Sequence, residues 1–238
     1  MTAFRGSHRP NFREGRRALT YDEYWEQQGL VMRAKLYDRE AIICERIPKG
    51  SRVLVIGCGA SYLPFALRDK GCRVTVSDIA PAAIGIFTAK GIPGFILDLE
   101  NIDESSVVGK YDVVVASEVL EHIRNPERAI ETLSKHAERF LISVPNSAFY
   151  RYRLHLMFSG RFFVQWARHP AEHLRYWSHR DFLEWLAAMD LVVQTAVPAN
   201  GLACGGLCPR MKDVWPNLFA HQIVYDCRVT APEDIVRV

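Results

Sequence analysis

Residues 53–61 read Val-Leu-Val-Ile-Gly-Cys-Gly-Ala-Ser, four apolar residues followed directly by a glycine-rich turn. A continuous apolar run of this length is typical of a strand that is buried on both faces of a parallel sheet. Glycine at positions 57 and 59 lets the chain turn sharply and lets a ligand approach the backbone more closely than a side chain would allow. The stretch therefore predicts a buried first strand, a turn suited to a ligand, and a helix that begins near Tyr62.

Strand and helix patterns keep alternating after this turn. Apolar runs predict further strands at residues 73–77, 93–97, 111–116, 140–144, 191–197 and 222–229. Helical spacing predicts helices at residues 21–47, 62–70, behind Pro81, 126–136, 146–160 and 178–189. Five successive alternations with short connections predict an α/β fold built on a doubly wound parallel sheet.

Composition narrows the classes of protein that this chain can be. Its 238 residues suit one domain, and no apolar run approaches the roughly 20 residues that cross a bilayer. A net charge of +3 does not favour binding to nucleic acid. The six cysteines lack the paired spacing of a zinc site. We expect a cytoplasmic protein with reduced thiols, comprising a basic arm (residues 1–20) and one domain (residues 21–238).

Acidic residues stand at the ends of the next two predicted strands. Asp78 follows the glycines by about 20 residues, where a carboxylate can accept hydrogen bonds from ribose hydroxyls, although it can also cap the next helix. Asp98 is placed to accept a bond from an adenine amino group. A dinucleotide fits badly, because Tyr62 stands where its fingerprint needs a third glycine. The pattern predicts a pocket for an adenosine that carries a cationic tail.

Three motifs, at residues 53–59, 74–81 and 111–122, have the order and spacing of the motifs that define a known protein family. In them the chain resembles the class I S-adenosylmethionine (SAM)-dependent methyltransferases of types 11 and 12. The resemblance implies a Rossmann-like, mostly parallel seven-stranded sheet with an antiparallel last strand. From the residues themselves we also expect an N-terminal helical extension, by the helical spacing of residues 21–47, and a helical, aromatic cover insertion at about 147–178, by the aromatic residues gathered there. The resemblance also implies SAM as cofactor, S-adenosylhomocysteine as product and a small-molecule acceptor. The cofactor-binding residues it implies are Gly57, Cys58 and Gly59 for the methionine part, Asp78 and Ile79 for the ribose, Asp98 and Leu99 for the adenine, and Ser117 and Glu118 beside the sulfonium.

Two positions depart from that pattern. Val55 stands where the family usually has an acidic residue, and Ser61 where it has a third glycine, although Ser61 can instead cap the following helix. Loss of one charged hydrogen bond costs roughly 1.5–3 kcal/mol, or about ten- to a hundredfold in affinity. We therefore expect SAM binding that is weaker than is usual in the family, or a site that has lost activity.

Narrower resemblances leave two functions open. The chain is similar to the methionine biosynthesis protein MetW family at His173 and in five short segments, residues 140–146, 152–156, 159–161, 178–182 and 215–222. Residues 118–122 are instead similar to the ubiquinone O-methyltransferase pattern. The main hypothesis is a methyltransferase acting on a small molecule. The alternative is a MetW-like protein with weak or no catalysis that binds or regulates a metabolic enzyme.

His122, at the mouth of the fourth strand, is the candidate general base. Its alternative is a histidine that only bonds to backbone at a helix start, and His173 is a further base candidate. Glu118, Glu121 and His122 offer ligands for a hard cation such as Mg2+. On a helix these three side chains would diverge, so no metal is expected.

Overall fold

In the computed structural model, the described chain comprises all residues except 1–22, 24, 26–30, 162–172, 203–210 and 231–238. The predicted basic arm lies outside these residues. The strands are β1 (Arg52–Ile56), β2 (Arg73–Asp78), β3 (Gly94–Ile96), β4 (Val113–Ser117), β5 (Arg139–Pro145), β6 (Leu191–Gly201) and β7 (Ala220–Val229). The helices are α2 (Asp38–Arg46), α3 (Leu63–Asp69), α4 (Pro81–Thr88), α5 (Pro126–Ser134), α6 (Tyr150–Ser159), α7 (His179–Ala188), α8 (Met211–Val214) and α9 (Pro216–Phe219), with 3-10 turns η1 (Glu104–Ser106) and η2 (Leu120–His122).

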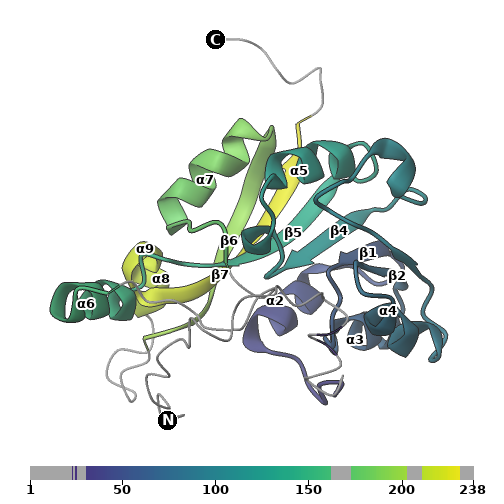
Figure 1. Cartoon of the computed structure of the whole chain (residues 1–238), viewed down its shortest axis with the longest axis horizontal. Helices are drawn as coiled ribbons and strands as arrows, with labels where there is room; N and C mark the ends of the chain where they lie inside the picture. The colour runs from purple at the N-terminus through teal and green to yellow at the C-terminus, as the bar shows by residue number, and fades with distance from the viewer. Residues whose placement is uncertain (1–22, 24, 26–30, 162–172, 203–210, 231–238) are drawn as a thin grey trace.

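The described strands form one seven-stranded sheet in the order β3-β2-β1-β4-β5-β7-β6 (Figure 1). Strands β1 to β5 run parallel, whereas β7 is antiparallel to both β5 and β6. The predicted mostly parallel sheet with an antiparallel last strand is confirmed. Since β1 has β2 on one side and β4 on the other, the strand order reverses there. Open α/β sheets bind ligands at such a switch point, beyond the carboxyl ends of the strands.

After the exposed Arg52, strand β1 is apolar from Val53 to Ile56 because both faces of the sheet are covered. Val53 and Val55 enter a core that includes residues of α2, α3 and α4. Leu54 and Ile56 enter the opposite core with residues of α5 and α7. Figure 1 shows the first three helices on one side of the sheet and the latter two on the other.

The N-terminal helix is shorter than its apolar periodicity predicts. Residues 31–37 are not helical, so the prediction of one helix through residues 21–47 is wrong in that part. Val31 is 76% exposed, whereas Leu36 packs against the core from this non-helical segment. Instead α2 begins at Asp38, and the Glu40 carboxylate caps it by accepting a hydrogen bond from Tyr37 N (2.8 Å).

The C-terminal third also differs in detail from its prediction. Helix α6 begins at Tyr150 and not at Asn146, because the Asn146 amide donates to backbone carbonyls of Pro216, Asn217 and Ala220 (3.1, 3.2 and 2.8 Å). Both late strands are longer than expected. Cys44, Cys58, Cys72 and Cys227 are free thiols, and Cys204 and Cys208 lie outside the described residues. Among the described helices, none has both the length and the apolar character needed to cross a membrane.

Candidate active site

A cavity of about 470 Å³ lies at the carboxyl ends of β1, β2 and β4. Ten residues that the sequence predicts for the site all line it: Gly57, Cys58, Gly59, Asp78, Ile79, Asp98, Leu99, Ser117, Glu118 and His122. They come from four separate loops that follow successive strands. The parallel sheet brings them together because the carboxyl ends of its strands share one edge.

The glycine loop after β1 requires glycine for two reasons. Gly57 (φ +57°) and Gly59 (φ +45°) adopt left-handed backbone conformations, which other residues adopt only with strain. A Cβ on Gly57 would also lie 2.6 Å from Val119 Cγ2, and one on Gly59 would lie 2.8 Å from the Trp25 ring. Between them, burial and then the charge of Asp78 raise the pKa of the Cys58 thiol, which therefore stays neutral. The loop thus offers backbone and apolar surface to a ligand.

Asp78 connects this loop to the helix after β2. Its Oδ2 accepts a hydrogen bond from Gly59 N (2.9 Å), and its Oδ1 accepts one from Ala80 N (3.0 Å), the residue before α4. The N-cap of α4 is Ala80 and makes no side-chain cap hydrogen bond, so Asp78 bonds to the residue before the helix and does not cap it. Asp78 also lines the cavity. Each carboxylate oxygen has a second lone pair that can accept from a ligand hydroxyl.

Asp98 is held in its own loop at the far side of the cavity. Its Oδ1 accepts from Glu100 N (2.9 Å), and its Oδ2 accepts from Asn101 Nδ2 (2.7 Å). This local turn fixes the carboxylate before any ligand binds. Leu99 beside it supplies an apolar surface against which a flat ring can pack.

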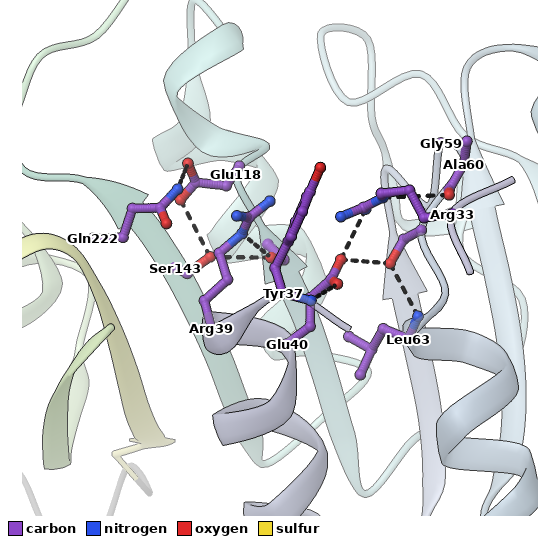
Figure 2. Close-up of polar contacts among 12 residues, drawn as sticks. Arg33, Tyr37, Arg39, Glu40, Gly59, Ala60, Leu63, Glu118, Ser143 and Gln222 are labelled. Atoms are coloured by element: carbon purple, nitrogen blue, oxygen red, sulfur yellow. Dashed lines mark hydrogen bonds and ion pairs between the residues drawn. The ribbon is translucent and has the colours of Figure 1, made fainter. Parts of the chain in front are cut away.

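Glu118 has a strained backbone and a carboxylate whose two oxygens each accept a hydrogen bond (Figure 2). Its φ is +57°, a conformation that a non-glycine residue adopts at a cost. Gln222 Nε2 donates to its Oε2 (2.7 Å) and the Ser143 hydroxyl donates to its Oε1 (3.4 Å). Burial raises the pKa of Glu118, and the charge of Arg39 opposes that shift most strongly. Arg39 Nε in turn donates to the Ser117 hydroxyl (3.3 Å).

Four residues of the N-terminal segment line the cavity and were not predicted from the sequence: Trp25, Arg33, Arg39 and Glu40. Glu40 is only 1% exposed, and its Oε1 accepts a hydrogen bond from the Ser61 hydroxyl (2.7 Å). The same hydroxyl accepts from Leu63 N (3.1 Å), the first residue of α3. The N-cap of α3 is Tyr62, which makes no side-chain cap hydrogen bond, so Ser61 bonds to the helix start without occupying the predicted cap position. A signal for Glu40 was present, because it shares one helical stripe with the buried Ile43 and Ile47.

Glu121, His122 and His173 form a second group, of which His122 lines the cavity. Glu121 is fully buried, and neither of its carboxylate oxygens has a hydrogen-bond partner among the described residues. Its backbone carbonyl accepts from Leu174 N (2.7 Å) and Arg175 N (3.1 Å), which brings the His173 ring to 4.7 Å from the His122 ring. Burial, and then the charge of Glu118, raises the pKa of Glu121 well above its usual range. Burial, and then His122, lowers the pKa of His173 to about 4, so this ring is neutral at pH 7.

This group changes the ligand set that the sequence suggested for a cation. Glu118 is bound by Gln222 and Ser143, and His173 joins Glu121 and His122 in its place. One ligand atom from each of the three lies within 4.8 Å of the others. Two histidines and a glutamate are a donor set of catalytic zinc sites, in which ligand atoms can be at most ~4.2 Å apart. The cluster therefore suits a divalent cation after a small side-chain adjustment.

A family model described as a methyltransferase domain matches residues 24–196. The chain belongs to this methyltransferase family. A ubiquinone biosynthesis O-methyltransferase of Xylella fastidiosa (strain 9a5c) is 28% identical to it over 190 residues, which cover 68% of this chain and 76% of that protein. Another, from Aeromonas salmonicida (strain A449), is 32% identical over 105 residues, which cover 41% of this chain and 44% of that one.

Solved structures share the fold of this methyltransferase. One is the 1,6-didemethyltoxoflavin-N1-methyltransferase of Burkholderia thailandensis (TM-score 0.54, 18% identity, 81% of this chain and 77% of that one). Another is the magnesium protoporphyrin IX methyltransferase of Synechocystis PCC 6803 (TM-score 0.53, 16% identity, 94% and 90%). Both of those structures hold S-adenosylhomocysteine. The chain is accordingly a class I SAM-dependent methyltransferase.

The predicted cover contributes unevenly to the site of this methyltransferase. Within the described part of residues 147–178, Leu174 lines the cavity. Helix α6 instead packs toward the start of β7, where the Tyr152 hydroxyl hydrogen-bonds His221 Nε2 (2.6 Å) and the Tyr150 ring lies 5.9 Å from the Phe219 ring. The rest of the predicted cover, residues 162–172, lies outside the described chain.

Proposed function

We propose that this methyltransferase transfers the methyl group of SAM to a hydroxyl oxygen of a small acceptor, beside His122. The observation that carries the proposal is the cluster of Glu121, His122 and His173, whose member His122 lines the cavity. A hydroxyl must lose its proton as it attacks, so it needs a base or a cation, whereas a neutral amine needs neither to begin. The O-methyltransferase relatives support the same acceptor class.

The cavity supports one orientation of the cofactor. Asp78, fixed between the glycine loop and α4, accepts from the ribose hydroxyls, with Ile79 alongside. Asp98 and Leu99 hold the adenine. Gly57, Cys58 and Gly59 lie along the methionine part, and Ser117 and Glu118 lie near the sulfonium. The methyl group then faces the mouth of the cavity, where His122 lies.

The reaction in this site is an in-line displacement. The acceptor oxygen bonds to the methyl carbon as the carbon–sulfur bond breaks and its electron pair stays on sulfur, which yields S-adenosylhomocysteine. His122 takes the proton of the acceptor. Correct alignment of the reacting atoms contributes about 7–11 kcal/mol at most, and general-base catalysis adds about a hundred- to ten-thousandfold in rate.

Methyl-labelled SAM tests the proposed acceptor class directly. We expect label transfer to simple phenols such as catechol, and none to 1,2-diaminobenzene, which has the same ring and spacing but amine nucleophiles. Transfer to the diamine alone would refute the hydroxyl acceptor. Binding of S-adenosylhomocysteine without turnover on any acceptor of either kind would favour the MetW-like alternative, which stays a prediction, as does the metabolic enzyme partner it implies.

A second role for the cluster is favoured by the buried Glu121 carboxylate, which has no donor among the described residues. A divalent cation held by Glu121, His122 and His173 would supply the missing positive charge and lower the pKa of an acceptor hydroxyl. A bound cation and His122 acting as a base are alternative ways to deprotonate the acceptor hydroxyl. Chelation of divalent cations distinguishes these two mechanisms.

Removal of divalent cations with EDTA is expected to lower the rate of methyl transfer about a hundredfold if the cation operates, since such an ion contributes several kcal/mol. Zn2+ or Mg2+ added back would restore the rate. The matched variant Glu121→Gln should be slow both before and after chelation, because the amide is a poorer ligand. A wild-type rate that EDTA does not change would leave His122 as the base without a cation.

A further inference from the structure

The methionine end of the cofactor carries an ammonium and a carboxylate, and the glycine loop offers no charged partner for either. Val55, under that loop, is 3% exposed and wholly apolar. A charged pair nevertheless lies on this side of the cavity. It comes from Arg33 and Glu40 of the N-terminal segment, which precedes the first strand of the sheet (Figure 2).

Glu40 is a buried carboxylate that is held in place from three directions. Its Oε1 accepts from Arg33 Nη2 (2.8 Å) and from the Ser61 hydroxyl (2.7 Å), and its Oε2 accepts from Tyr37 N (2.8 Å). A carboxylate removed from water is costly unless it is paired, so this geometry fixes one orientation. The Oε2 has a free lone pair, because an ionised carboxylate has about four acceptor sites and only three are used.

Arg33 completes the pair and retains a donor. Its Nη2 binds Glu40, and its Nε donates to Ala60 O (3.5 Å) in the glycine loop. Its Nη1 is buried and has no hydrogen-bond partner among the described residues. A buried guanidinium nitrogen that finds no acceptor within the described part of the chain needs one from elsewhere. The cavity that Arg33 lines is where a ligand would supply that acceptor.

We propose that Arg33 and Glu40 bind the amino-acid end of SAM, with Arg33 Nη1 donating to the carboxylate and Glu40 accepting from the ammonium. The acidic group that Val55 does not supply thus comes from α2. A paired arginine and glutamate carry no net charge, which matches a zwitterion. The pair therefore selects a complete cofactor over an adenosine thioether that lacks the amino acid. This proposal rests on the proposed orientation of the cofactor in the cavity.

Two ligands isolate this contact: S-adenosylhomocysteine and methylthioadenosine. Both are neutral-sulfur thioethers of adenosine, and only the first has the amino-acid end. Titration calorimetry of the full chain is expected to show a ten- to hundredfold loss of affinity for S-adenosylhomocysteine in Glu40→Gln and in Arg33→Gln, the effect of losing one charged hydrogen bond. Affinity for methylthioadenosine should stay within about twofold of wild type. Glu45→Gln, an exposed carboxylate of the same helix, is the matched control and should change neither.

The other possible results of this titration each lead to a different conclusion. Equal losses for both ligands would overturn the proposal, because Glu40 would then act only by shaping the loop through Ser61. Unchanged affinity for S-adenosylhomocysteine in both variants would overturn it as well. Thermal melting shows whether a variant is folded, and Arg33→Gln, which lies outside α2, tests the same contact if Glu40→Gln does not fold. A wild-type chain that binds neither ligand would refute the proposed function itself.

Discussion

His122→Ala is expected to lower the turnover number about a hundred- to ten-thousandfold, the usual contribution of a positioned general base. His122 lines the mouth of the cavity and lies 4.7 Å, between ring centroids, from His173. It is distant in the proposed orientation from the adenosine part. Affinity for S-adenosylhomocysteine should therefore remain close to wild type. Rates of label transfer to a phenol, with calorimetry in parallel, measure both quantities.

The matched control for this variant is His155→Ala, since His155 lies on the exposed helix α6 and not along the cavity. A pH profile adds a separate test. If His122 is the base, the wild-type rate falls at acidic pH, because the protonated ring cannot accept another proton. The variant should lose that dependence. A turnover number within threefold of wild type would exclude His122 from the chemistry.

Asp78→Ala is expected to weaken S-adenosylhomocysteine binding at least a hundredfold. The substitution removes the acceptor proposed for two ribose hydroxyls, each charged bond contributing about 1.5–3 kcal/mol. It also releases Gly59 N, to which the carboxylate is bound at 2.9 Å, and so loosens the glycine loop. Calorimetry measures the loss, and Asp69→Ala, an exposed carboxylate at the end of α3, serves as control.

Methylthioadenosine distinguishes the effect of Asp78 from that of Glu40. Both ligands contain the ribose, so Asp78→Ala should weaken both, and S-adenosylhomocysteine at least as much because it also lies along the loosened glycine loop. Glu40→Gln should weaken only the ligand with the amino-acid end. Unchanged affinity of the Asp78 variant for either ligand would refute the ribose role, whatever the behaviour of the Glu40 variant.

The residues at the strand ends were predictable from the sequence because a short local pattern indicates each of them. A buried strand is indicated by an apolar run, and a tight turn is indicated by glycine. The acidic residue of the site then follows at a known distance along the chain. Parallel strands then bring such ends to one edge without further information. For this reason residues as far apart as Gly57 and His122 lie along one cavity.

Long-range side-chain contacts were not predictable in the same way. Glu118 is bound by Gln222, which is 104 positions away on the antiparallel strand β7. His173 reaches His122 because the backbone of residues 174 and 175 bonds to Glu121 O. In the sequence, Glu40 is one of several polar residues in an amphipathic helix. Its hydrogen-bond partner Ser61 is 21 positions away. No local pattern encodes which of many polar residues will meet across an interface.

The sequence by itself determined the sheet, its glycine loop at residues 53–61 and the ring of residues at the strand ends, because these follow from hydrophobic periodicity and backbone conformation, which are local. Only the tertiary structure decided that Arg33 and Glu40 stand beside that loop, that Glu118 turns to Gln222, and that His173 joins Glu121 and His122. Those contacts depend on how α2, β7 and the segment around Leu174 pack against the sheet. Such packing is a property of the whole chain and not of any stretch within it.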